Sequence, residues 1–308
     1  GFEAETRNFK KGGMCRNCMW HIPPMFWMTM RMANLFQSLE ATAARGAGGL
    51  LPEAQASLTA ALCALQRPEG GFAGLDGRAD PYFTLFAWLS LRALGAAYDR
   101  GKLRAYMLAH RHDKSRTDAQ CALFLLAVEG QDTRVPWLRL VTAFLKGETR
   151  EVYGTFLVML ATGEVPGWLP RLAWWRQRRM FETEAAKRMP TPRLAAGLAL
   201  ATLAGEKGAG ILPILESRRC PAGGFSSAAA AEADLLATAV ARFALWHGRP
   251  ARDEHGRDIH ATQRDLAFIE ACWLEDGSFG ASPHAARGDA EHAFYALLAL
   301  GTCRTDHS

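Results

Sequence analysis

Apolar positions in this chain recur with the periodicity of α-helices. Two kinds of helical segment alternate along the chain. One kind is rich in Ala, Gly, Leu and Thr and is apolar nearly all round, and the other carries most of the Arg and Lys. A helix that is apolar on every side is expected between two layers of neighbours, whereas a charged helix is expected on the outside. The strand-type alternation of Val and Ile is absent almost everywhere. The pattern therefore predicts an all-α fold with an inner and an outer set of helices.

The outer helices are predicted where the charged stretches lie. Their approximate ranges are 53–66, 102–110, 135–145, 170–181, 211–216 and 261–274. The Ala-rich run 228–233 is predicted to lead into an inner helix.

A repeated motif marks the starts of the inner helices. Three loops, 66–72, 220–225 and 273–279, end in Gly-Gly-Phe or Gly-Ser-Phe, and each is followed by an Asp that opens an apolar helix: Asp80, Asp234 and Asp289. Asp at such a position caps a helix by accepting backbone N–H bonds. The same frame recurs without the glycine loop at Asp118, Glu151 and Pro192. The six frames are roughly 30 to 55 residues apart, which is the length of two helices and their connections.

The repeat resembles that of the protein prenyltransferase β subunit and of the squalene-cyclase family. The resemblance is carried by Gly70 to Phe86, with its Gly-Gly-Phe loop and Asp-Pro-aromatic-x-Thr helix start, and by Asp289 to Tyr295, which is similar to the last repeat of the first family. It implies an (α/α)6 toroid, a double ring of inner and outer helices. The toroid is expected over residues 51–308, with residues 1–50 as a tail and a Met/aromatic segment packing on the ring.

The resemblance also implies a site at the mouth of the ring. In prenyltransferases an Asp-x-Cys and a later His hold zinc, and these positions fall here on Asp234, Leu236 and His292. Leu236 removes the thiolate ligand, and the recurrence of Asp at this place in the other repeats favours Asp234 as a helix cap. His292 is expected either as a ligand and catalytic residue, sharing a surface with Tyr295 one turn on, or as a locally hydrogen-bonded histidine. Glu291 is expected to face another direction on the helix.

Substrate-binding residues are expected near the other helix starts. Four arginines recur there and would form a collar for a diphosphate, or else are solvated loop charges. With two tyrosines they make up the predicted substrate site: Arg78, Tyr82, Arg116, Tyr153, Arg193 and Arg287.

The segment before the repeats contains Cys15-x-x-Cys18-x-x-His21, followed by Met and aromatic residues up to Phe36. Two thiolates and an imidazole suit zinc or iron, so this is an alternative metal site. The other interpretation is a Met-rich helix that packs across the ring or a partner.

A basic aromatic patch, Trp174-Trp175-Arg-Gln-Arg178-Arg179, lies on one predicted outer helix. It would bind lipid headgroups or an acidic partner, or else the Trp side chains turn inward and the Arg side chains outward.

Composition narrows the function classes. The net charge of +5 is mild for 308 residues and no basic stripe is formed, so nucleic acid binding is not expected. Seven Cys in apolar stretches suggest free thiols and a cytoplasmic protein. No apolar run is long enough to cross a membrane. The first functional hypothesis is a prenyltransferase-like or terpenoid-handling enzyme that binds an isoprenoid diphosphate or another hydrophobic substrate, with zinc as a possible cofactor. The alternative is a non-catalytic toroid that binds a peptide or protein.

Overall fold

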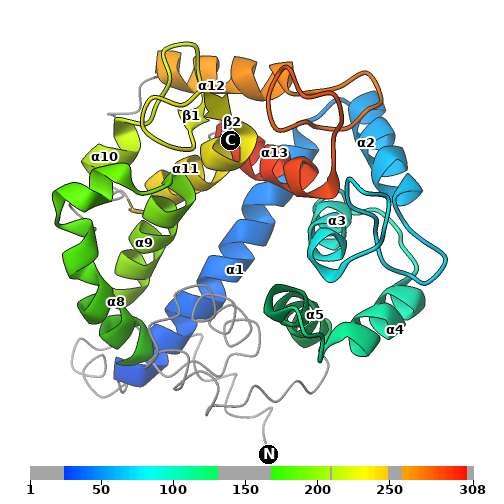
Figure 1. Cartoon of the computed structure of the whole chain (residues 1–308), viewed down its shortest axis with the longest axis horizontal. Coiled ribbons are helices and arrows are strands. Elements are labelled where there is room, and N and C mark those ends of the chain that lie inside the picture. Colours follow the sequence, from blue (N-terminus) through cyan, green and yellow to red (C-terminus); the bar gives the residue numbers. More distant parts are fainter. Residues whose placement is uncertain (1–23, 131–167, 209, 249–258, 304–308) are drawn as a thin grey trace, which may run out of the picture.

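The computed structural model describes residues 24–130, 168–208, 210–248 and 259–303, and most of these residues are helical (Figure 1). The inner helices are α3 (Pro81–Ala93), α5 (Arg116–Val128), α9 (Thr191–Ala204), α11 (Leu235–Gly248) and α13 (Ala290–Cys303). The outer helices are α2 (Pro52–Ala64), α4 (Arg100–His110), α8 (Trp168–Phe181), α10 (Leu212–Glu216) and α12 (Ile259–Ala271). Helix α1 (Pro24–Gly48), the 3₁₀ turn η3 (Glu184–Arg188) and the strands β1 (Phe225–Ser226) and β2 (Ala233–Asp234) complete the description. The predicted all-α class is confirmed, as are the outer helices within these ranges; the one predicted at 135–145 lies outside them.

The inner helices pack side by side in chain order. Helix α3 packs on α5, α9 on α11, and α11 on α13, while each outer helix lies against an inner one. Helix α13 also packs on α3, so the last described helix adjoins the first inner one (Figure 1). Small residues make this close packing possible: in α13 alone Ala290, Ala293, Ala296 and Ala299 are almost completely buried.

The inner helices run in the same direction. Near their starts, the Tyr82 hydroxyl of α3 donates to Glu291 of α13. Near their ends, Arg92 of α3, His247 of α11 and Gly301 of α13 all lie against residues 38–42 of α1. The N-terminal ends of these three helices therefore lie at one end of the assembly and their C-terminal ends at the other.

The glycine loops hold the helix starts in place by one repeated arrangement. The loop Phe is completely buried in two of the repeats, at Phe72 and Phe225. Its N–H donates to a Thr hydroxyl in the first turn of the next helix, Thr84 at 2.8 Å or Thr238 at 2.9 Å. That hydroxyl in turn donates to the carbonyl of the capping Asp. The loop and the inner helix are thus locked together at the point where the helix begins.

Among the inner helices that the structure describes, Asp caps those that follow a glycine loop and no others. Asp80 Oδ1 accepts from the Phe83 N–H at 2.8 Å, Asp234 Oδ1 from Ala237 at 2.6 Å, and Asp289 Oδ1 from His292 at 2.9 Å. The prediction for Asp118 was wrong, because the cap of α5 is Ser115, whose hydroxyl accepts from the Asp118 N–H.

The run 228–233 does not extend helix α11. It forms a turn that brings β2 back to β1, with Phe225 opposite Asp234, and Ala230 adopts a positive φ of 61°. A left-handed backbone conformation interrupts a right-handed helix, so the predicted helical lead-in was wrong despite its Ala content.

Helix α1 lies across the C-terminal ends of the inner helices (Figure 1). Its Glu40 pairs with Arg92 of α3 at 2.8 Å, and its Ser38 contacts His247 of α11 at 2.9 Å. Phe36 packs edge-on against Phe124 of α5. The second half of α1 is therefore part of the core, at the end of the assembly opposite to the helix starts.

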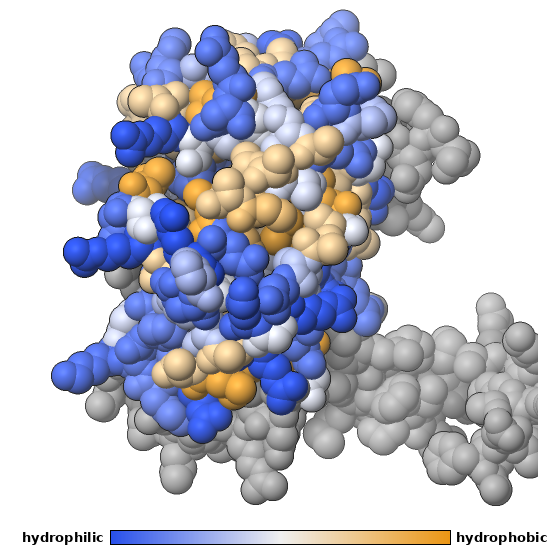
Figure 2. Space-filling view, turned by 90° about the vertical axis from the view of Figure 1, so that its right-hand side faces the viewer, coloured by the Kyte–Doolittle hydropathy of each residue, from blue (hydrophilic) through white to orange (hydrophobic). Residues whose placement is uncertain are grey.

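The outer surface is mostly polar. Figure 2 shows the side of the molecule that carries α2 and α4, where hydrophilic residues surround a stretch of apolar ones in the middle. No described helix is both long and apolar enough to cross a bilayer.

Candidate functional site

Titratable and aromatic side chains gather where α3, α11 and α13 begin. We call this group the helix-start cluster, and its members are Tyr82, Asp234, Asp289, Glu291, His292 and Tyr295. The glycine loops and capping Asp residues described above fix the positions of these helix starts, so the cluster stands on rigid elements.

His292 is held by the capping Asp of its own helix. Its ring Nδ1 lies 2.9 Å from both carboxylate oxygens of Asp289, whose Oδ1 also caps the helix. Burial by itself would lower the pKa of His292, but the hydrogen bond and charge of Asp289, with the charges of Glu291 and Asp234, raise it above its usual value. Because Asp289 occupies Nδ1, Nε2 is the nitrogen that can act on a substrate or ligand.

Glu291 does not face away from the cluster, as the sequence suggested. Its Oε1 accepts a 2.5 Å hydrogen bond from the Tyr82 hydroxyl of α3. Burial raises the pKa of Glu291, and the hydrogen bond from Tyr82 and the charge of His292 only partly oppose this. A half-buried carboxyl group of this kind exchanges a proton closer to neutral pH than an exposed one does.

An aromatic wall lies beside this pair. The ring of Phe86 is 4.9 Å from Tyr82, 5.8 Å from Phe294 and 5.4 Å from Tyr295, measured between centroids. Tyr295 is thus near Glu291 and the Tyr82 ring, as expected for a residue one turn beyond His292. Burial raises the pKa values of both tyrosines, so their hydroxyls stay protonated at neutral pH.

Cys121 of α5 borders the same wall. Burial is the main reason that the pKa of its thiol is raised to about 12. A thiol with such a pKa is not a nucleophile at neutral pH.

Asp234 has the structural role that the repeat suggested, since it caps α11. Burial raises the pKa of its carboxyl group, against the opposing effects of the Ala237 N–H, Ser227 and His292. It is therefore close enough to His292 for the two charges to interact. With Leu236 in place of the thiolate, the pair supplies two donors where a zinc site needs three or four. No set of three or more His, Cys, Asp or Glu in the described ranges is arranged to hold a metal.

Three arginines of the predicted collar are described, and all three are exposed. Arg78 and Arg287 are exposed in loops before α3 and α13, and Arg193 is exposed at the start of α9, where it contacts Met180 at 3.9 Å. The backbone of Arg116 begins α5, but its side chain lies outside the description, as do Tyr153 and the alternative metal site Cys15, Cys18 and His21. For the three arginines described, solvated charge is the interpretation that fits.

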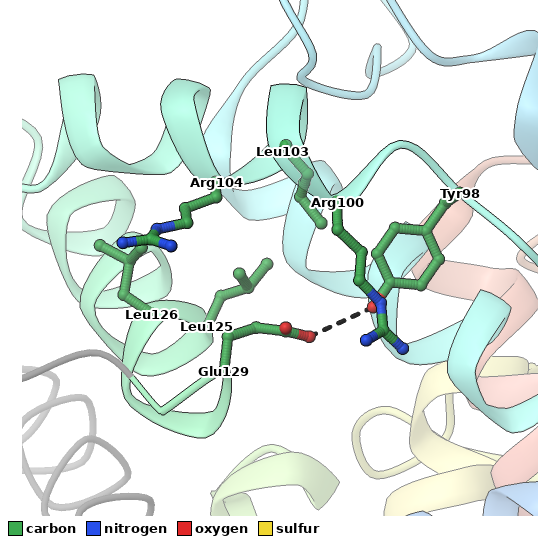
Figure 3. Close-up of a pocket in the computed structure, with 8 residues that line it drawn as sticks. Tyr98, Arg100, Leu103, Arg104, Leu125, Leu126 and Glu129 are labelled. Atoms are coloured by element: carbon green, nitrogen blue, oxygen red, sulfur yellow. Dashed lines mark hydrogen bonds between the residues drawn. The ribbon is translucent and has the colours of Figure 1, made fainter.

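A pocket of about 230 Å³ lies away from the cluster, between α4 and the end of α5 (Figure 3). Glu129 in its wall already accepts from Trp88 Nε1 at 3.0 Å and from the Tyr98 hydroxyl at 3.2 Å. The pocket is smaller than the 300 Å³ or so typical of small-molecule sites. It also opens at the end of the inner helices opposite to His292, so it does not extend the cluster.

Two members of the cluster were not predicted as functional. Asp289 was predicted only as a helix cap. Its contact with the His292 imidazole joins two residues that are three positions apart, a spacing that can be seen in the sequence. The role of Glu291 could not be predicted from spacing, because its hydrogen-bond partner Tyr82 is 209 residues away in the chain.

No protein-family model matches the chain, and a search of curated proteins finds no match.

Proposed function

We propose that this protein is a terpenoid-handling enzyme built as an (α/α)6 toroid, which acts on a lipid-like substrate at the starts of its inner helices. One observation carries the proposal: an Asp289–His292 pair and a Tyr82–Glu291 pair, from helices at the two ends of the chain, converge beside an aromatic wall. Acid–base groups next to apolar, aromatic surface are what a reaction on an isoprenoid chain requires.

Ring closure is supported by the glycine loops. The positive-φ glycine of each loop lies against an outer helix: Gly70 against Lys102 of α4, and Gly223 against Arg264 of α12. In the last loop, Gly277 lies against Ser57 of α2, the first outer helix. Each loop thus contacts the outer helix of the next repeat, and the loop of the last repeat contacts α2, the outer helix of the first repeat. Helix α13 packing on α3 gives the inner ring the same order.

The charges of the cluster favour one kind of substrate head group. The charges of Asp234, Asp289 and Glu291 all act on a single histidine, His292, whereas Arg78, Arg193 and Arg287 are exposed to solvent. Carboxylates repel a diphosphate at short range, so an alcohol or amine head group suits the site better than an isoprenoid diphosphate does. The aromatic wall would stabilise positive charge on such a ligand.

His292 and Glu291 would divide the acid–base work. His292, whose Nδ1 is held by Asp289, can donate a proton from Nε2, while the Glu291 carboxylate, hydrogen-bonded to Tyr82, can accept one. The described donor set falls short of a tetrahedral zinc site, so no step of this chemistry is assigned to a metal.

Ligand-induced stabilisation tests the proposal. Thermal unfolding should be followed with farnesol, farnesylamine and farnesyl diphosphate, and we expect the alcohol or the amine to stabilise the protein more than the diphosphate. At 100 times Kd the stabilisation is about 2.7 kcal/mol. His292→Gln and Glu291→Gln should each weaken binding about tenfold through loss of a polar contact. His284→Gln and Glu275→Gln, both exposed in the same region, are the matched controls and should have no effect.

A second candidate, the non-catalytic toroid that binds a peptide or protein, is favoured by α1. This helix is already docked across the inner helices of its own chain, which shows that their ends accept a helix. If none of the three ligands stabilises the protein, while a partner co-purifies with it at a fixed ratio, the enzyme proposal fails and this alternative replaces it.

A further inference from the structure

Outer helix α8 presents apolar side chains to solvent. Trp168 is 52% exposed, Leu172 37% and Trp175 63%. These residues are spaced i, i+4 and i+7, so at 3.6 residues per turn they lie within an arc of about 60°. They form one continuous stripe, about 10 Å long.

The opposite face of α8 attaches the helix to the molecule. Leu169, Ala173 and Phe181 are buried, and α8 packs on α9. Trp174 stacks on Phe181 with ring centroids 5.9 Å apart. The expectation that the Trp residues turn inward is thus right for Trp174 and wrong for Trp175. Helix α8 therefore has two apolar faces, of which only one is used by the fold.

Positive charge surrounds the exposed stripe. Helix α8 contains no Asp or Glu, and Arg171, Arg178 and Arg179 are exposed on it. Residues 168–193 hold seven Lys and Arg against two Glu, an excess as large as the net charge of +5 of the whole chain. The excess charge of the protein is thus concentrated on and next to the helix that exposes two indoles.

We propose that α8 docks this protein on the surface of an anionic lipid bilayer, lying flat with Trp168 and Trp175 at headgroup depth. Indoles favour the membrane–water interface, and arginines beside them pair with lipid phosphates and anionic headgroups. A convex helix with protruding indoles suits a deformable bilayer, whereas a protein partner would have to offer a matching groove. Helix α8 lies at the rim of the assembly, where a planar surface can reach it (Figure 1).

Vesicle co-sedimentation of the full chain tests this docking surface. The protein is mixed with phosphatidylcholine vesicles, with or without about 30 mol% phosphatidylserine. We expect binding to the anionic vesicles only, weakening as salt is added. Arg178→Gln with Arg179→Gln should weaken it about 30-fold, since each base near the surface contributes about 1 kcal/mol. Trp168→Ser with Trp175→Ser should weaken it at least tenfold.

The matched control replaces exposed apolar residues elsewhere, Leu51→Ser with Leu75→Ser, and should leave binding unchanged. Because all the substituted side chains are exposed, the melting temperature of each variant should stay within a few degrees of the parent, which shows that it is folded. Absence of binding to anionic vesicles at low salt overturns the proposal. So does binding that the α8 variants do not alter, or α8-dependent binding of an acidic protein without any binding to vesicles.

Discussion

At the scale of single residues, a buried threonine hydroxyl joins two of the three glycine loops to the helices that follow them. Thr84 accepts from the Phe72 N–H and donates to the Asp80 carbonyl, and Thr238 repeats both bonds with Phe225 and Asp234. A buried backbone N–H without a partner costs more free energy than a typical hydrogen bond contributes. This position therefore bears on the stability of the site even though it touches no substrate.

Thr84→Val tests this role. The substitution keeps the shape of the side chain but leaves the Phe72 N–H without its partner, while the Asp80 carbonyl keeps the bond from the Thr84 N–H. We expect the free energy of unfolding to fall by about 1–3 kcal/mol. Urea unfolding measures the change, with Thr183→Val as the control, because that hydroxyl is exposed and should contribute less than about 0.5 kcal/mol. An equal loss in both variants would contradict the assigned role.

At the scale of elements, α1 and α13 approach each other through glycine. A Cβ on Gly301 would lie 1.8 Å from the carbonyl oxygen of Thr42, and one on Gly46 would lie 1.9 Å from that of Leu297. Neither glycine has a positive φ, so the backbone conformation does not require glycine at these positions. The close contact of the two helices does.

Gly301→Ala separates this steric effect from helix propensity. Alanine favours a helix over glycine by about 1 kcal/mol, but here the methyl group would force the two backbones apart at a typical cost of 1–3 kcal/mol or more. We expect net destabilisation of about 2 kcal/mol and faster proteolysis between α1 and α2. In Gly48→Ala the new methyl group meets no atom within 4 Å, so this variant should be as stable as the parent or slightly more stable. Equal stability of both variants would show that α1 is not held by this contact.

At the scale of the whole molecule, two histidines give opposite pH dependences of stability. His247 contacts Ser38 of α1, and burial and the charge of Arg45 lower its pKa. The unfolded chain thus takes up a proton more readily, and stability from His247 is lost as pH falls below about 6.5. The raised pKa of His292 acts the other way: its stabilising effect is complete below about 6.5 and is lost as pH rises through the folded-state pKa.

Urea unfolding between pH 5 and pH 8 should resolve the two effects. On acidification, His247→Gln should lose less stability than the parent, whereas His292→Gln should lose more. Each slope can differ from the parent by at most about 1.4 kcal/mol per pH unit, the value for one proton. Parallel curves for the three proteins would exclude both assignments.

Part of the candidate site was predictable because its signals are local. A capping Asp acts within one turn, so Asp80, Asp234 and Asp289 could be placed from spacing alone. His292 stood out because the corresponding positions in other repeats, such as Phe83 and Ala237, are not histidine. The failures were also physical: Asp118 resembled a cap, but Ser115 lies three residues before it and binds its N–H.

The sequence by itself determined the helical class, the outer helices of the described ranges and the Asp caps that follow the glycine loops, since apolar periodicity and first-turn hydrogen bonds involve residues close together in the chain. Only the tertiary structure decided that Glu291 meets Tyr82, that α1 lies across the ends of the inner helices, and that Trp175 faces solvent while Trp174 does not. These features depend on which helices become neighbours and on how each one is rotated about its axis. Both are decided by packing interactions summed over the whole core, so they cannot be predicted from any local stretch of sequence.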